Sequence, residues 1–181
     1  MTIPRLCFAL LANMLAVTAS VAAAPGAVPV PDAVIALKGC WLGVGQAVGK
    51  PVTVALRSRA ILQDAMVVVD VESSALADPR DRYSAHLLFG SARERADEQG
   101  DDIMGFWSDS FGGAFTALGR GSSRSDGFDI VYRYPDSDFI NRWTLSGDKL
   151  TWLIVERTPK RVDKVFATYR LSRAPCAAES A

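Results

Sequence analysis

The chain holds a single histidine among its 181 residues, and its neighbours do not complete a catalytic arrangement. In the alternating stretch 82–89, His86 falls in the polar register, opposite Tyr83 and Leu87, so its side chain is expected to point outward. No Gly-x-Ser-x-Gly motif is present, and the sequence places no acidic residue to orient His86. We therefore expect no catalytic residue of the hydrolase type and no metal site.

Carboxylates are the second group of residues with possible chemistry. The pair Asp101 and Asp102 lies in a charged stretch, and the pair Asp136 and Asp138 lies in a Tyr-Pro-Asp-Ser-Asp segment typical of a turn. An Asp-x-Asp pair could contact calcium, but the longer ligand series of a calcium loop is missing. Asp109, flanked by two serines, is interpreted as a polar group at a strand end.

Aromatic side chains are the remaining candidates, because they could line a binding cavity. Aromatic inward faces with an occasional polar member suit an amphipathic ligand. The alternative is that these side chains fill the core, since a barrel of this strand number can be packed solid or can hold one small ligand. The cavity-lining candidates are Trp107, Phe128, Tyr132, Tyr134, Asn141, Trp143, Trp152 and Tyr169.

Elements with period-two alternation must position these side chains. In the stretch 127–134, Phe128, Ile130 and Tyr132 take one face while Asp129 takes the other, as in a half-buried strand. Nine or ten such strands, at a spacing of roughly 8–12 residues, predict an all-β sandwich or barrel. We favour an antiparallel up-and-down β-barrel of about 9–10 strands.

Three segments fall outside the strand pattern. Residues 32–38 predict one helical turn, with Asp32 as its N-cap and Gly39 ending it. Residues 91–102 are strongly charged and predict a short helix or a solvated loop. Residues 119–127, rich in glycine and serine, are interpreted as an exposed hairpin loop.

Two cysteines bracket the strands. Cys40 stands at the predicted first strand and Cys176 just beyond the last, whereas Cys7 falls near the N-terminus. In an oxidising compartment such a pair forms a structural disulfide. A bond between these positions favours a closed barrel, whose first and last strands are neighbours, although a sandwich could also bring them together.

The N-terminal residues resemble a secretory signal. Arg5 precedes an almost wholly apolar stretch, 6–17, which is followed by small residues and a cleavage position near residues 22–24. The apolar stretch is shorter than the ~20 residues of a membrane-spanning helix. We therefore expect a signal peptide at 1–24 and a periplasmic or secreted protein with no transmembrane segment after cleavage.

The mature chain is expected to be a single domain. Residues 25–36 form an extended lead-in, residues 37–176 the barrel, and residues 177–181 a C-terminal tail. Twenty basic and twenty acidic residues balance over the whole chain, with no basic cluster, so nucleic-acid binding has no support.

The segment Gly39-Cys40-Trp41 resembles the Gly-x-Trp motif that opens the first strand of lipocalins and related calycin barrels. The resemblance implies that Trp41 closes one barrel end and that an arginine of the last strand, Arg170 or Arg173, packs across it. Residues 105–113 and the terminal hairpins are also similar to secreted bacterial lipocalin-like domains of unknown function. A haem-binding calycin barrel of the nitrobindin type would need a histidine near the C-terminal strands, where this chain has none, so no cofactor is expected.

These observations favour an exported, non-catalytic barrel that binds a small hydrophobic or amphipathic molecule. A protein–protein interaction module, such as a periplasmic inhibitor or an envelope accessory factor, is the alternative. A third possibility is an isomerase or cyclase that uses polar side chains inside the barrel.

Overall fold

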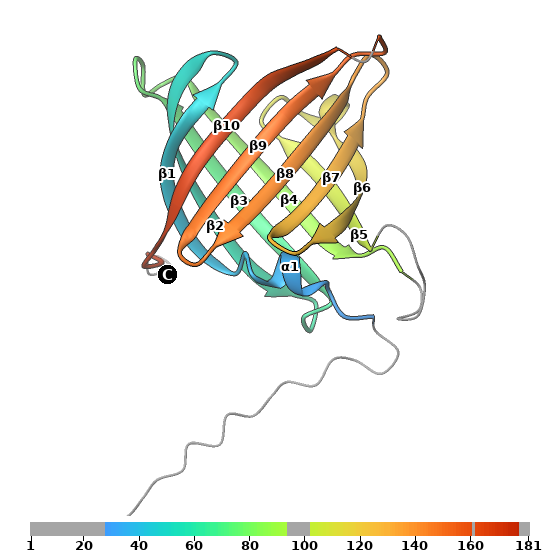
Figure 1. The fold of residues 1–181 in the computed structure, drawn as a ribbon. Helices are drawn as coiled ribbons and strands as arrows, with labels where there is room; N and C mark the ends of the chain where they lie inside the picture. The colour runs from blue at the N-terminus through green and yellow to red at the C-terminus, as the bar shows by residue number, and fades with distance from the viewer. Residues whose placement is uncertain (1–27, 94–101, 161, 178–181) are drawn as a thin grey trace, which may run out of the picture.

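The computed structural model describes residues 28–93, 102–160 and 162–177, which form one closed barrel of ten antiparallel strands (Figure 1). Each strand pairs with its neighbours in sequence, and β1 pairs with β10. The strands are β1 (Gly39–Ala47), β2 (Lys50–Ile61), β3 (Met66–Ala75), β4 (Arg82–Ser91), β5 (Ile103–Asp109), β6 (Ala117–Arg124), β7 (Gly127–Arg133), β8 (Asp138–Ser146), β9 (Lys149–Arg157) and β10 (Asp163–Ala174). The predicted up-and-down barrel is therefore confirmed.

Several sequence predictions fall on other parts of the chain. The signal peptide with its cleavage position, most of the charged stretch 91–102 and most of the C-terminal tail lie outside the described residues. Among the residues that are described, no helix is long and apolar enough to cross a membrane.

Strand β6 differs from its prediction. Residues 119–127 do not form an exposed hairpin loop: β6 continues to Arg124, and residues 125–126 make the turn into β7. The glycines that look like loop residues face inward, where the Tyr132 ring lies close against the wall. A Cβ at Gly119 would lie 2.8 Å from a ring carbon of Tyr132. Glycine is thus required here by close packing within a strand.

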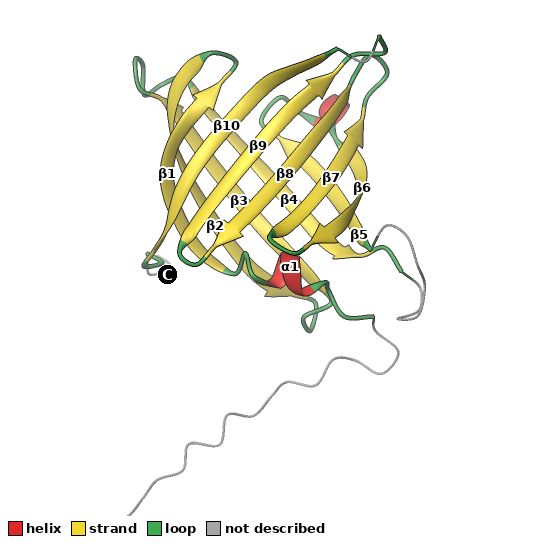
Figure 2. Ribbon diagram, in the orientation of Figure 1, coloured by secondary structure: helices red, strands yellow, loops and turns green. Residues whose placement is uncertain are grey.

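One end of the barrel is closed by the segment that precedes β1. Helix α1 (Asp32–Ile35) lies beneath this end, and Val34 and Leu37 are fully buried there (Figure 2). Asp32 is the first helical residue rather than the N-cap, which is Pro31, and no side chain caps the turn. Trp41 is fully buried as well, and its indole Nε1 donates to the Leu37 carbonyl at 2.8 Å.

An arginine of β10 covers Trp41 from outside. The Arg173 guanidinium carbon lies 4.2 Å from the Trp41 ring centroid, and its nitrogens donate to the carbonyls of Lys38 (2.7 Å) and Ala36 (3.3 Å). Arg170 is exposed on the outer wall. Of the two arginines that the resemblance left open, Arg173 is therefore the one that lies on Trp41.

The seam between β1 and β10 is fastened at this same end. Cys40 lies opposite Ala174 in the strand register, and it is bonded to Cys176, 136 residues later, as predicted. Because the bond joins β1 to the segment directly after β10, it holds the barrel closed.

Aromatic rings fill the closed half. Phe128 stacks on Trp143 with centroids 5.8 Å apart, and Trp143 stacks on Trp152 at 4.2 Å. Phe89 meets Phe128 edge-to-face at 5.4 Å. This column of stacked rings ends at Trp152, which borders the open half of the barrel.

Candidate functional site

A cavity of about 680 Å³ occupies the other half of the barrel and opens at the end opposite α1. Trp107, Tyr132 and Trp152 are almost fully buried and lie among its deepest lining residues. The loops from β1 to β2, β3 to β4, β5 to β6 and β7 to β8 contribute residues to its mouth. Its volume falls within the roughly 300–1,000 Å³ of small-molecule sites.

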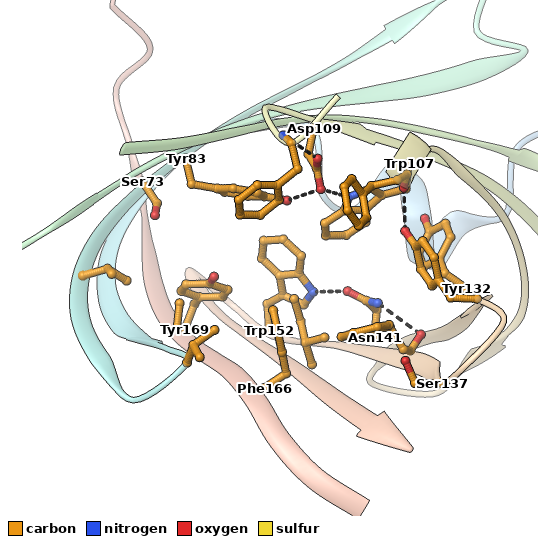
Figure 3. Close-up of a pocket in the computed structure, with 18 of the residues that line it drawn as sticks. Ser73, Tyr83, Trp107, Asp109, Tyr132, Ser137, Asn141, Trp152, Phe166 and Tyr169 are labelled. Carbon is orange, nitrogen blue, oxygen red and sulfur yellow. Dashed lines mark hydrogen bonds between the residues drawn. The ribbon is translucent and has the colours of Figure 1, made fainter. Parts of the chain in front are cut away.

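Ten of the described residues that line the cavity are aromatic (Figure 3). Trp152 contacts Tyr169 at a centroid distance of 5.0 Å and Trp107 at 6.0 Å. Phe139 packs edge-to-face on Phe166 at 5.1 Å. The lining includes all four tyrosines of the chain, which are Tyr83, Tyr132, Tyr134 and Tyr169.

A carboxylate is built into this aromatic wall. Asp109, the last residue of β5, accepts hydrogen bonds from the Trp107 indole at 2.9 Å and from the Tyr83 hydroxyl at 3.2 Å, both at Oδ2. Its Oδ1 accepts the backbone N–H of Phe111 at 2.9 Å. Figure 3 shows Tyr83 and Trp107 on either side of Asp109. These three donors fix the carboxylate in place on the wall of the cavity.

Burial raises the pKa of the cavity tyrosines, and for two of them the nearby Asp109 carboxylate raises it further. Burial, and next the negative charge of Asp109, raise the pKa of Tyr83 and of Tyr134. Burial alone raises the pKa of Tyr169 to about 12. The pKa of Tyr132 is raised chiefly by burial. All four phenols are therefore neutral at physiological pH and can act as hydrogen-bond donors.

Two further polar groups lie deep in the cavity. The Asn141 side chain is buried, accepts the Trp152 indole N–H at 2.9 Å and donates to the Phe139 carbonyl at 3.4 Å. The Tyr132 hydroxyl is buried against Gly105 and has no hydrogen-bond partner among the described residues. Nor do three or more His, Cys, Asp or Glu side chains gather anywhere in these residues to hold a metal ion.

Six of the eight candidates chosen from the sequence line the cavity, and two do not. Phe128 and Trp143 are fully buried in the closed half, beneath the cavity floor. Both are on the inward face, as expected, but they stand near the ends of β7 and β8 that meet α1. The six residues that do line the cavity are Trp107, Tyr132, Tyr134, Asn141, Trp152 and Tyr169.

Sequence reasoning missed Asp109 and Tyr83 as site residues. The flanking serines make Asp109 look like a polar group at a strand end, although alternation from Trp107 places it on the same inward face two residues later. Tyr83 was recognised as inward-facing, but nothing in the sequence pairs it with Asp109. Ser73 and the two phenylalanines of the β5–β6 loop, Phe111 and Phe115, also line the cavity.

His86 lies on the outer wall, away from the cavity. The expectation that no acid orients it is wrong, because Asp70 stands directly across from it on β3 and the two side chains meet at 2.6 Å. Ser108 is its neighbour on β5, but the serine hydroxyl donates to the His86 backbone carbonyl at 3.4 Å rather than to the imidazole. The three residues form a polar row on the surface.

No protein-family model matches the chain, and no curated protein matches it either. Among solved structures, 16 chains match. Rv2717c from M. tuberculosis superimposes with a TM-score of 0.63 at 14% identity, over 84% of this chain and 99% of that one. The S-type phycobiliprotein lyase CPES from Guillardia theta gives a TM-score of 0.53 at 13% identity, over 81% of this chain and 93% of that one. The likeness is one of fold, and it fits the lipocalin-like, calycin-type barrel expected from the sequence.

Proposed function

We propose that this protein is exported and binds one small hydrophobic or amphipathic molecule in the open half of its barrel, without catalysing a reaction. The observation that carries this proposal is the half-filled interior. One end of the barrel is packed solid, whereas the other holds a cavity of about 680 Å³ with an aromatic wall. An apolar cavity with a few fixed polar groups is the usual form of a small-molecule site.

The disulfide supports export. Disulfides persist in oxidising compartments and are rare in the cytosol. The bond between Cys40 and Cys176 closes the barrel seam, so the fold benefits directly from an oxidising environment. One of the structural neighbours is named as a lyase, so the barrel shape by itself does not decide between binding and catalysis.

Binding of an uncharged fluorescent probe, N-phenylnaphthylamine, tests the proposal. The mature protein is expected to bind it saturably, with enhanced probe emission. Ser73→Phe places a ring inside the cavity and is expected to abolish the signal, because Ser73 is a buried lining residue. Ser74→Phe is the matched control, since the next residue of the same strand faces outward and should leave binding unchanged.

Thermal unfolding of both variants shows whether they are folded. A folded wild-type protein that binds no apolar probe, or equal binding by Ser73→Phe and the wild type, would contradict a cavity ligand. Ala75→Phe offers a second blocking variant, because Ala75 is also a buried lining residue of β3.

The rim of the open end favours a second candidate, a protein-binding module. Exposed apolar side chains gather on the loops and strand ends there, namely Val48, Leu76, Phe111, Phe115, Val162 and Val165. Exposed apolar clusters mark contact sites for partners. A folded protein whose cavity binds no probe would favour this second function over the first.

A further inference from the structure

The cavity that we propose as a ligand site carries an unbalanced charge. Among the described residues that line it, three are aspartates, Asp81, Asp109 and Asp136, and one is a lysine, Lys50. The Lys50 ammonium is bonded to Asp81 at 2.7 Å at the mouth, where both side chains are at least half exposed. Two negative charges therefore remain uncompensated by lining residues.

Asp109 is the carboxylate placed to act on a ligand. It stands at the end of β5 nearest the mouth, and the almost fully buried Trp107 lies two residues deeper on the same face. A carboxylate offers about four lone-pair positions. The donors from Trp107, Tyr83 and Phe111 take three of them, so one acceptor position remains available.

The aromatic rings around Asp109, like its carboxylate, favour a positively charged ligand. Tyr83 and Phe111 lie with their centroids 5.7 Å apart, beside the carboxylate that both residues contact. Aromatic faces attract ammonium and guanidinium groups, and the attraction grows when water is excluded. A carboxylate with aromatic neighbours thus suits an organic cation and repels an organic anion.

The geometry points to an amphipathic cation as the ligand class, with its ammonium head at Asp109 and its apolar body against Trp107, Trp152 and Tyr169. This inference rests on the proposed function and narrows it. A fatty acid or another apolar anion would bring its carboxylate next to Asp109 and Asp136, with no unpaired lysine or arginine among the described lining residues to receive it. Repulsion between a ligand carboxylate and these neighbouring aspartates would weaken binding.

Three decyl compounds that differ only in the head group test the charge preference. Decylammonium, decanol and decanoate are each titrated against bound N-phenylnaphthylamine at low ionic strength. We expect the cation to displace the probe at a concentration about tenfold below that of decanol, and decanoate to be weaker than decanol. The preference for the cation should shrink as salt is added.

Asp109→Asn supplies the decisive variant, because asparagine keeps the shape and an acceptor oxygen but removes the charge. It is expected to erase the preference of the cation over decanol and to leave decanol binding within about twofold. Asp70→Asn makes the same change in net charge on the outer wall, beside His86. It should leave the order of the three compounds unchanged.

The outcomes separate this inference from the proposed function. Decanoate binding as tightly as the cation in the wild type would overturn the inference, while binding of any of the three would leave the cavity function standing. A cation preference that survives Asp109→Asn, or that Asp70→Asn removes equally, would also overturn it. If Asp109→Asn does not fold, the wild-type series and its salt dependence still decide. Failure of every probe would reject the cavity function itself.

Discussion

The two halves of this barrel share the same ten strands but differ in what their inward residues do. In the closed half, Phe89, Phe128 and Trp143 pack against one another and are fully buried. In the open half, aromatic rings stand around a cavity and the polar groups are retained. A single alternating pattern can therefore specify both a core and a binding site, depending on the height of each residue along the barrel axis.

Composition differs between the halves as well. All four tyrosines line the cavity, and none is placed in the closed half. A phenol presents an apolar ring and a polar tip, which suits a wall that faces a ligand or water. The closed end uses tryptophan and phenylalanine instead, together with the disulfide and the Arg173 contact. The disulfide and the Arg173 contact, which stabilise the fold, thus lie at the opposite end of the barrel from the residues that form the cavity.

Truncating one ring in each half should expose this separation most clearly. Trp143→Ala removes a fully buried side chain from the closed half and is expected to lower the free energy of unfolding by about 3–5 kcal/mol. Phe111→Ala removes a mostly exposed ring at the mouth, so the change should stay within about 0.5 kcal/mol. Chemical denaturation measures both. Similar losses in the two variants would contradict the division into a packed half and an open half.

Reduction of the Cys40–Cys176 bond should give the next largest effect. Removing a native disulfide from a small exported domain costs roughly 2–5 kcal/mol, and this bond closes a very long loop. We expect a clear drop in the midpoint of thermal unfolding when dithiothreitol is added. Probe binding should persist in the folded fraction, because the bond lies at the end away from the cavity. Cys40→Ala with Cys176→Ala is the control, and this double variant should be insensitive to the reductant.

Alkaline pH should lower the stability of the protein through its tyrosines, all of which line the open half. Because burial raises the pKa of Tyr169 to about 12, the folded chain keeps that proton while an unfolded tyrosine loses it near pH 10. The stabilisation is therefore complete below pH ~10 and is lost as pH rises towards the folded pKa, by roughly 1–3 kcal/mol for this residue. Unfolding midpoints between neutral pH and pH ~11, compared with those of Tyr169→Phe, measure it. An equal slope in the two proteins would contradict the assignment.

Sequence alone predicted the barrel, the strands at 82–89 and 127–134 to within two residues, the disulfide pair and six of the lining residues. It could not assign height along the axis, because alternation reports only which face a residue takes. Asn141 and Trp143 share one face of β8, yet Asn141 borders the cavity and Trp143 lies beneath it. Glycine-rich β6 resembles a loop in the sequence because Gly119 and Gly121, at inward positions, carry no side chains to form a pattern. The Tyr132 ring that packs against Gly119 belongs to β7.

The smallest predicted effect concerns the two arginines of β10, three residues apart. Arg173→Ala removes a guanidinium that covers Trp41 and donates to two carbonyls of the segment closing the barrel. Because the group is partly exposed, we expect a loss of about 1–2 kcal/mol. Arg170→Ala is the matched control on the outer wall and should change stability by less than about 0.5 kcal/mol. Arg173→Lys should restore only part of the loss, since an ammonium cannot reach both carbonyls with the planar fork of arginine. Equal effects of the two alanine variants would show that Arg173 does not help to close this end.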